Sequence, residues 1–463
     1  MKKLKVIIII TLIVFIAACA AKKAAFSNAD MADVVAIPNN QQYPSNAETG
    51  YNYLVNGDYL KSGVPYSLFK QAKIVEKENF LGRTGESATI PYNYNLVSAQ
   101  NGEKIVAPNC LHCHAQRMGD SLIVGLGNSL SDYTVPQDGT LKMTAMALKM
   151  MGTPKQQAAA DFFLKAVSNA NPYLVAKCKG VNIADRLTSV LAAHRDPGSF
   201  KWLDEEQLKI PDELIPTDVP AWWLLKKKNG MFFNGFGRGD FTRFLMASNL
   251  LTVSDTAESA EVLTHFNDVL AYLYSLKAPK YPKPIDEVLA EKGKKLFNAN
   301  CSGCHGTYGE KGNYPNLLIP TKVVQTDEAL VKSNFSNPQF IEWFKKSWFA
   351  TGNRPAQLVP FDGYIAQPLD GIWITAPYLH NGSVPNLETL LNSKLRPKFW
   401  ERNFDHPEYD FEKVGWKYET KTTQSNTSTY NTTLKGYGNG GHTFGDHFTD
   451  KERKAVIEYL KTL

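Results

Sequence analysis

The sequence is poor in cysteine, in long apolar runs and in clustered charge. It contains six cysteines in 463 residues, too few for a small disulfide-stapled scaffold. The formal net charge is +6, and no long basic block concentrates it, so no nucleic-acid partner is expected. With 43% hydrophobic and 21% charged residues, the composition excludes a disordered or collagen-like chain. A chain of this length is expected to form two or three domains, each with its own core.

One apolar run, at 6–18, follows three lysines at the N-terminus. Its length suits a secretory signal peptide better than a membrane-spanning helix, which needs about 20 residues. The run ends in IAAC at 16–19, which resembles a bacterial lipobox. We therefore expect 1–18 to be a lipoprotein signal peptide and 19–49 to be a linker lipidated at Cys19, with an uncleaved anchor helix as the alternative. The expected location is the periplasmic side of a bacterial membrane or the outer membrane.

Two cysteine pairs share the spacing of covalent haem attachment. The segments 110–114 and 301–305 read CLHCH and CSGCH, and both match C-x-x-C-H. Two thiols at this spacing lie one helical turn apart and form thioethers with the two vinyl groups of a porphyrin, and the adjacent histidine ligates the iron. Neither a redox disulfide nor half of a zinc site would explain a histidine after both pairs. We therefore expect two covalently bound haem c groups, one on Cys110, Cys113 and His114 and the other on Cys301, Cys304 and His305.

The two attachment motifs divide the chain into two predicted modules. A Pro/Lys-rich linker at 277–284 separates an N-terminal haem module, 50–276, from a C-terminal cytochrome c module, 285–463. The pattern V-x-x-Y-L-x-x-L occurs at 269–276 and again at 456–463, which suggests two copies of one unit, with coincidence as the alternative. The predicted fold class is mainly α: two cytochrome c-like helical modules with long loops, each with one covalently bound haem.

The second module carries helix signals near both of its ends. Asp286 is a predicted N-cap for a helix that runs to the second attachment motif. Gly293 in that helix permits close crossing by another helix. Thr449 and Glu452 form a predicted capping box at the start of a terminal helix.

Methionine, the common sixth ligand of iron in small cytochromes c, does not occur after Met246. The second haem therefore needs another ligand from its own module, where four histidines are present. His442, in the glycine-flanked turn GGHTFG, is favoured and His380 is the rival, whereas His406 and His447 are expected at the surface. Ligation by two histidines would hold the iron at a lower potential than ligation by histidine and methionine.

The sixth ligand of the first haem stays open. Four methionines follow its motif at a spacing more typical of a core stripe than of a ligand set: Met143, Met146, Met150 and Met151. His194 and His265 are further candidates. A first haem without a distal ligand would be the reactive one. The spare cysteine, Cys178, is expected to be inert, and a reactive thiol is the alternative.

Longer segments carry a family resemblance. The segment 369–387, LDGIWITAPYLHNGSVPNL, resembles the hallmark of the bacterial di-haem cytochrome c peroxidase superfamily. PNCLHCHA at 108–115, GLGN at 125–128 and DVPAWW at 218–223 look closer still to the rubber-oxygenase-like branch of di-haem c-type cytochromes. The resemblance implies an N-terminal haem that binds the oxidant and a C-terminal haem that transfers electrons. In that branch the second haem has two histidine ligands, the distal one close to the C-terminus, which fits His442 better than His380.

The resemblance also implies an electron bridge and a polar distal group. Trp222 or Trp223 matches the position of an aromatic residue that relays electrons between the haems, although a buried core pair would also explain them. Arg238, in GFGRGD, is a candidate distal-pocket residue able to polarise a bound peroxide, with a surface arginine as the alternative. No residue pattern indicates the calcium ion that could lie between two such modules. The chain is shorter than the rubber-cleaving enzymes, so a bulky polymer substrate is not carried over.

Three functions fit these features. The favoured one is a peroxidase-type oxidoreductase, in which electrons enter at the second haem and hydrogen peroxide or dioxygen reacts at the first. The alternatives are a purely electron-transferring di-haem cytochrome and, less favoured, a haem-dependent oxygenase that cleaves an unsaturated substrate. The expected partners are a small redox protein or a quinol-chain electron donor, and a membrane through the lipid anchor.

Overall fold

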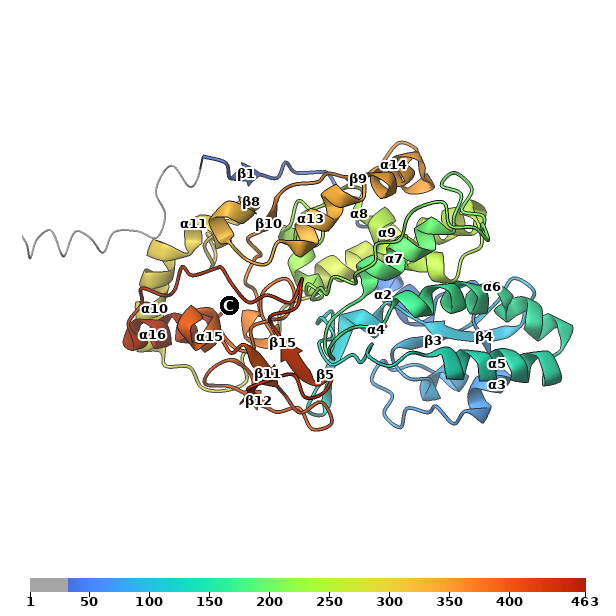
Figure 1. Cartoon of the computed structure of the whole chain (residues 1–463), viewed down its shortest axis with the longest axis horizontal. Coiled ribbons are helices and arrows are strands. Elements are labelled where there is room, and N and C mark those ends of the chain that lie inside the picture. The colour runs from blue at the N-terminus through green and yellow to red at the C-terminus, as the bar shows by residue number, and fades with distance from the viewer. Residues whose placement is uncertain (1–31) are drawn as a thin grey trace, which may run out of the picture.

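The computed structural model describes residues 32–463, which form an elongated molecule with much of the N-terminal half at one end and much of the C-terminal half at the other (Figure 1). The predicted signal peptide at 1–18, Cys19 and the first part of 19–49 lie outside the described residues, so the lipid anchor stays a prediction. Within residues 32–463, no helix combines the length and the apolar character that crossing a membrane requires.

The N-terminal half combines helices with two small antiparallel sheets. One sheet has the strand order β2 (Val64–Pro65), β4 (Lys104–Pro108), β3 (Tyr94–Ser98), and the other pairs β5 (Ala115–Met118) with β6 (Ser121–Val124). The helices of this half are α2 (Ala47–Asn56), α3 (Tyr66–Gln71), α4 (Leu111–His114), α5 (Asp138–Met151), α6 (Pro154–Ala170), α7 (Ala184–Ala193), α8 (Phe241–Leu245) and α9 (Thr256–Ser275).

The C-terminal half is richer in short strands and loops. In residues 32–463, four antiparallel sheets involve this half, and two of them include a strand, β1 or β7, from earlier in the chain. Their strand orders are β1 (Val35–Ala36), β8 (Leu317–Pro320), β10 (Gly363–Ile365); β14 (Glu419–Lys421), β11 (Phe399–Glu401), β15 (Thr429–Asn431); β12 (Tyr409–Asp410), β13 (Gly415–Trp416); and β7 (Gly237–Gly239), β9 (Ala356–Leu358). Its helices are α10 (Glu287–Asn300), α11 (Ser302–His305), α12 (Thr321–Val324), α13 (Ala329–Ser336), α14 (Pro338–Lys346), α15 (Leu387–Leu390) and α16 (Asp450–Leu460). The excess of helix over strand agrees with the mainly α prediction, whereas the several small sheets were not expected.

The predicted helix signals of the second module are confirmed. The Asp286 carboxylate accepts a hydrogen bond from the backbone N–H of Leu289 (2.9 Å) and so caps α10. Thr449 and Glu452 form the reciprocal capping box of α16, with each side chain accepting from the other residue's backbone N–H (3.3 and 2.8 Å). These local bonds satisfy backbone N–H groups that the first helical turn leaves unpaired.

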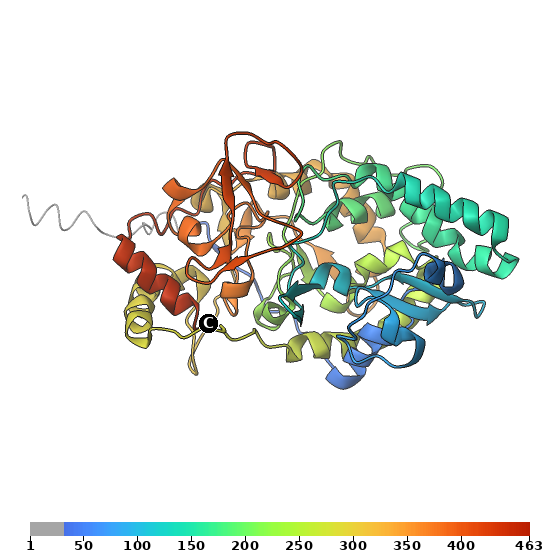
Figure 2. The same cartoon turned by 90° about the horizontal axis from the view of Figure 1, so that it is seen from below.

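In each half of the chain, two helices cross closely at a glycine. In the second half α16 lies against α10, as Figures 1 and 2 show, and a Cβ on Gly293 would fall 1.8 Å from the carbonyl oxygen of Ala455. In the first half α9 lies against α2, and a Cβ on Gly50 would fall 1.9 Å from the carbonyl oxygen of Asp268. Asp268 and Ala455 each directly precede the valine of the repeated V-x-x-Y-L-x-x-L pattern. The repeat in the sequence therefore corresponds to a repeated helix crossing.

The hydrophobic cores do not stop at the predicted linker 277–284. Trp343 and Phe344 of α14 belong to the same core as Val269 of α9, although they lie on opposite sides of that linker. The pairing of β1 with β8 also joins the N-terminal end of the described chain to the second half. The domain boundaries stay a prediction, and the packing shows that the two halves share buried surface.

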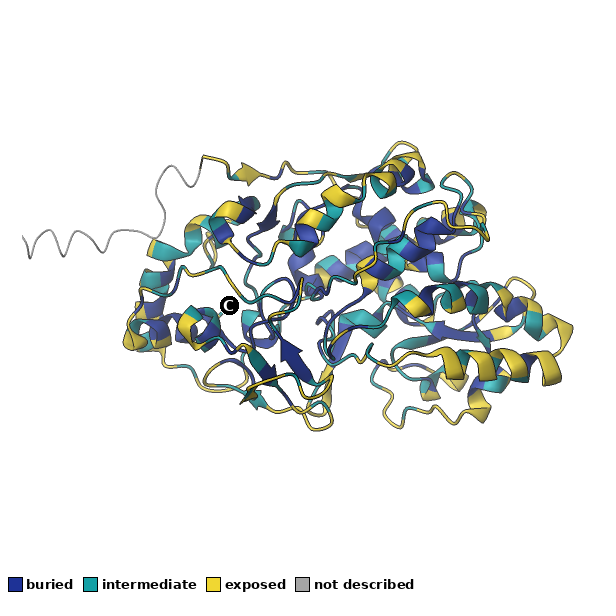
Figure 3. Ribbon diagram, viewed as in Figure 1, coloured by how far each residue is buried: buried dark blue, intermediate teal, exposed yellow. Residues whose placement is uncertain are grey.

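The expectation that the methionines of α5 form a core stripe is wrong. The exposed fractions of Met143, Met146 and Met150 are 67%, 63% and 77%, and Met151 is exposed as well. Leu148 alone in α5 is buried, because the helix packs against α6 on one side and faces solvent on the other (Figure 3). Helical periodicity predicted the shared face correctly, but it could not indicate which side of the helix α6 covers.

We predict that Gly293→Ala lowers the free energy of unfolding by about 1–3 kcal/mol, because the new Cβ would overlap the backbone of α16. Urea denaturation of the holoprotein measures this change. Gly139→Ala in α5 is the control, since nothing lies within 4 Å of its Cβ position, and it should change stability by less than about 0.5 kcal/mol. Equal effects of the two substitutions would contradict the close crossing.

Candidate haem sites

Both C-x-x-C-H segments form single helical turns, α4 and α11, that place the two thiols and the histidine on one short element. The backbone N–H groups of His114 and His305 donate to the carbonyls of Cys110 and Cys301 (3.1 and 3.0 Å), which closes each turn. The four attachment cysteines, Cys113 and Cys304 included, are free and partly buried. This arrangement fits covalent attachment of a porphyrin edge.

The arrangement of the side chains argues against the zinc alternative. Zinc is bound by thiolates, and no group of three or more His, Cys, Asp or Glu side chains in residues 32–463 is arranged to hold a metal ion by itself. The residues present therefore fit haem c, whose porphyrin supplies the other ligands of the iron.

The first histidine, His114, packs face to face with Trp222. The two ring centroids lie 4.5 Å apart with an interplanar angle of 19°. Burial lowers the pKa of His114 to about 3, so its imidazole is neutral, as a metal ligand must be. Its Nδ1 is buried and has no hydrogen-bond partner. The Trp222 ring, rather than a hydrogen bond, therefore holds the imidazole plane.

The second histidine, His305, is oriented by the backbone and faces His442. The Nδ1 of His305 donates to the carbonyl oxygen of Gln367 (2.8 Å), which leaves its Nε2 free to accept a metal. The ring centroids of His305 and His442 lie 6.1 Å apart. Two imidazole nitrogens that each lie about 2 Å from one metal ion place their ring centres about 6 Å apart. The observed spacing therefore fits one iron between the two rings.

A fixed turn presents His442. Its φ is +45° and follows Gly441 at +69°, and its backbone N–H donates to the carbonyl of Val324 (2.7 Å). The guanidinium of Arg396 donates to the carbonyls of Gly441 and His442 (2.6 and 3.1 Å). Burial, with His305 nearby, lowers the pKa of His442 to about 3, so this ring is also neutral. The buried Nδ1 of His442 has no hydrogen-bond partner in the protein.

The rival ligand, His380, is engaged elsewhere. Its ring stacks on Tyr364, with centroids 4.2 Å apart, and its Nε2 donates to the Tyr364 hydroxyl (3.1 Å). That hydroxyl in turn donates to the carbonyl of Asp327 (2.6 Å). His406 and His447 are exposed, as expected from the sequence.

The other candidates for the first haem are also placed away from His114. His194 stacks on Trp202 and hydrogen-bonds to the carbonyl of Leu203 through Nδ1 (3.0 Å), whereas His265 is exposed on α9. The methionines of α5 face solvent. No described contact joins any of the ligands named from the sequence to His114.

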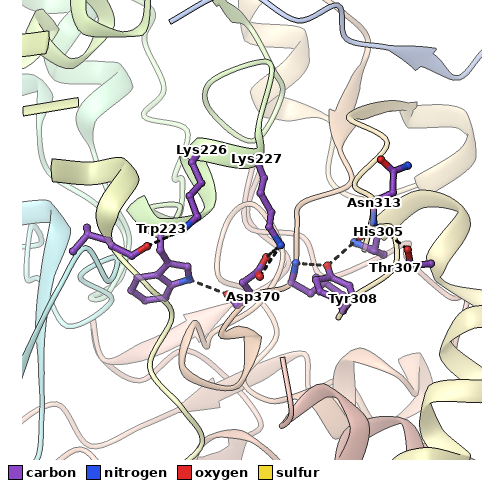
Figure 4. A network of polar contacts seen from close by, with 10 residues as sticks. Trp223, Lys226, Lys227, His305, Thr307, Tyr308, Asn313 and Asp370 are labelled. Atoms are coloured by element: carbon purple, nitrogen blue, oxygen red, sulfur yellow. Dashed lines mark hydrogen bonds and ion pairs between the residues drawn. The ribbon is translucent and has the colours of Figure 1, made fainter. Parts of the chain in front are cut away.

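Trp222 and Trp223 begin the short 3-10 helix η3 (Trp222–Lys227) and reach toward the two different sites. Whereas Trp222 stacks on His114, the Trp223 indole N–H donates to the carbonyl of Asp370 (2.8 Å), as Figure 4 shows. The ion pair of Lys227 with the Asp370 carboxylate (2.7 Å) holds that segment in place. The two predicted bridge residues thus lie between the sites.

A series of polar contacts continues from Asp370 to the second histidine, His305, through Tyr308. The Tyr308 hydroxyl accepts from the backbone N–H of Leu369 (2.6 Å) and donates to the carbonyl of His305 (3.0 Å). Figure 4 shows these contacts in one continuous network. The contacts of Tyr308 and Gln367 with His305 were not predicted from the sequence. Tyr308 could have been noticed three residues after His305, whereas Gln367 acts through its carbonyl and leaves no signal in the sequence.

Arg238 lies in β7 and is buried, but its described contacts are with its own loop and not with either haem histidine. Its guanidinium donates to the carbonyl of Gly237 (3.3 Å) and lies beside Gly230 and Gly235. Its role as a distal-pocket residue stays a prediction. Cys178 is buried in an apolar core, and burial raises its pKa to about 12, which agrees with an inert thiol.

Two protein-family models match parts of the second half of the chain. Residues 290–357 match the model of the cytochrome c family, and residues 363–401 match the family described as RoxA-like, cytochrome c-like. The chain contains cytochrome c domains, which imply covalently bound haem c with iron and indicate a haem electron-transfer protein or oxidoreductase. The second match includes Gln367, Asp370 and His380.

Two similar proteins come from Sinorhizobium fredii, and both carry names that state no function. The uncharacterized protein y4iM is 29% identical over 310 residues, which cover 58% of this chain and 68% of that protein. The uncharacterized protein y4iJ is 41% identical over 253 residues, which cover 41% of each chain. The match thus spans less than half the length of y4iJ.

We predict that replacing Cys110 and Cys113 together with serine, or Cys301 and Cys304 together, removes one covalent haem in each case, because each pair forms both thioethers of one site. Intact-protein mass spectrometry and the pyridine haemochrome spectrum count the remaining haem. Cys178→Ser should retain both haems. A double variant with unchanged haem content would show that its motif is not an attachment site.

Proposed function

We propose that this protein is an extracytoplasmic, lipid-anchored di-haem c-type cytochrome that acts as a peroxidase-type oxidoreductase. The observation that carries the proposal is the difference between the two sites. His305 has a second histidine 6.1 Å away between ring centres, whereas the ring contact described for His114 is with Trp222 and not with another histidine.

Bound haem c supplies one-electron redox chemistry and, where no side chain fills the distal position, a place for peroxide or dioxygen to react. At the second site His305 and His442 would both hold the iron and so leave no place for such a substrate. At the first site His114 would provide the proximal ligand, and the proposal requires the opposite side of the iron to accept the oxidant. Electrons are thus stored at the second site and used at the first.

Trp222 and Trp223 connect the sites. Trp222 is in van der Waals contact with the first histidine, and Trp223 is hydrogen-bonded to the segment that reaches the second through Tyr308. Both tryptophans are also buried, so they form part of the hydrophobic core in addition to connecting the two sites. An aromatic pair held this rigidly provides a short path for an electron.

Further support comes from the repeated helix crossing at Gly50 and Gly293. Each crossing pair belongs to the half of the chain that carries one attachment motif, as two copies of a cytochrome module would require. We further propose that Cys19 carries the lipid, and that a small redox protein or a quinol-linked donor reduces the second haem.

We predict that the oxidised holoprotein shows one low-spin and one high-spin ferric EPR signal and oxidises a reduced donor when peroxide is added. His442→Ala should convert the low-spin signal to high spin, because the ligand opposite His305 is lost. His380→Gln and the surface variant His447→Ala should leave both signals unchanged. Two low-spin signals without peroxide turnover would instead indicate a protein that only transfers electrons.

We predict that Trp223→Phe slows electron transfer between the haems by about 10-fold, because phenylalanine lacks the N–H that binds the Asp370 carbonyl. Stopped-flow spectroscopy of the half-reduced protein measures the rate. Trp202→Phe is the matched control, since Trp202 stacks on His194 away from both sites. If the two variants transfer electrons at the same rate, the Trp223 contact is not part of the path.

A further inference from the structure

The segment after η3 contains two buried cations without a counter-charge. The exposed fractions of Lys228 and Arg238 are 5% and 6%, and neither forms an ion pair with a carboxylate in residues 32–463. The Lys228 ammonium donates to the carbonyl of Phe232 (3.1 Å), and the Arg238 guanidinium donates only to the carbonyl of Gly237. A buried charge is costly unless an opposite charge or several strong hydrogen bonds compensate it.

Lys228 lines a hollow of about 440 Å³ on the side of the N-terminal segment. This volume suits a small organic molecule. The lining contains no carboxylate: it consists of amide side chains such as Asn39 and Gln41, a tyrosine, a proline and the two lysines Lys226 and Lys228. The charged side chains of the lining are therefore both lysines.

The walls of the hollow are held by specific bonds. Gln42 donates to the carbonyl of Gly239 (2.8 Å) and accepts from the backbone N–H of Phe241 (3.0 Å), which fastens the N-terminal segment over β7. Asn229 donates to the carbonyl of Ile37 (2.8 Å). The hollow is thus a fixed feature in which the amides supply neutral donors and Lys228 supplies the charge.

We propose that this hollow binds an organic carboxylate, with Lys228 as the anchoring cation and Arg238 as a second positive charge behind it. The proposal does not depend on the assignment of peroxidase activity. Burial, with Arg238 nearby, lowers the pKa of Lys228 to about 7, and a bound carboxylate would restore its charged form. The carboxylate comes either from a small molecule in solution or from a propionate of a bound haem.

Succinate is the probe for the first source. Isothermal titration of the holoprotein, with chloride at matched ionic strength as the reference, should show saturable binding to wild type. Lys228→Met should weaken this binding about 30-fold or more, because it removes a buried charged hydrogen bond. Lys226→Met, at the exposed rim of the hollow, is the matched control and should change the affinity by less than about 3-fold.

The second source gives a different pattern. If a haem propionate occupies the site, wild type does not bind succinate. In the absence of added anion, Lys228→Met and Arg238→Met then each lower the melting temperature of the protein. Each variant also shifts the reduction potential of one haem. The proposal is overturned if succinate does not bind and both variants melt at or above the wild-type temperature with unchanged potentials, since removal of an uncompensated charge stabilises the fold. The wild-type titration and the second variant keep the test decisive if one variant fails to fold.

Discussion

Two consecutive tryptophans fix the distance between the two candidate haem sites. Trp222 belongs to the core of the N-terminal half and stacks on His114, whereas Trp223 belongs to the largest core of the C-terminal half and binds Asp370. Neighbouring Cα atoms are about 3.8 Å apart, so neither core can shift without moving the other. The large aromatic area buried on both sides makes this junction rigid. The relation between the sites therefore depends on one dipeptide.

The two halves use one helix crossing but treat their histidines differently. Gly50 and Gly293 bring the first and last helices of each unit into backbone contact, directly before the same valine of the repeated pattern. The Gln367 carbonyl then orients His305, whereas the Nδ1 of His114 has no such partner. A hydrogen bond to the second imidazole nitrogen makes a histidine a stronger electron donor to its metal. The same backbone plan thus supports two histidines with different hydrogen bonding, which would give bound haems unequal electronic properties.

Much of the local structure could be predicted from the sequence. The helix caps at Asp286 and Thr449 and the close approach at Gly293 follow from neighbouring residues along the chain, and the structure confirms them. The methionine face of α5 was assigned to the wrong side, because periodicity defines a face but not its surroundings. The choice of His442 over His380 rested on its glycine-flanked turn and on a family resemblance, and the ring spacing to His305 supports it through geometry.

The sequence by itself determined which residues can hold haem, because attachment requires two thiols and a histidine within five consecutive positions. Only the tertiary structure decided what surrounds them: the ring opposite His305, the carbonyl of Gln367, the Trp222 contact of His114 and the carboxylate-free hollow around Lys228. These features join segments that lie tens to hundreds of residues apart. Chain folding, rather than local spacing, brings such segments together, and backbone groups that act as partners leave no mark in the sequence.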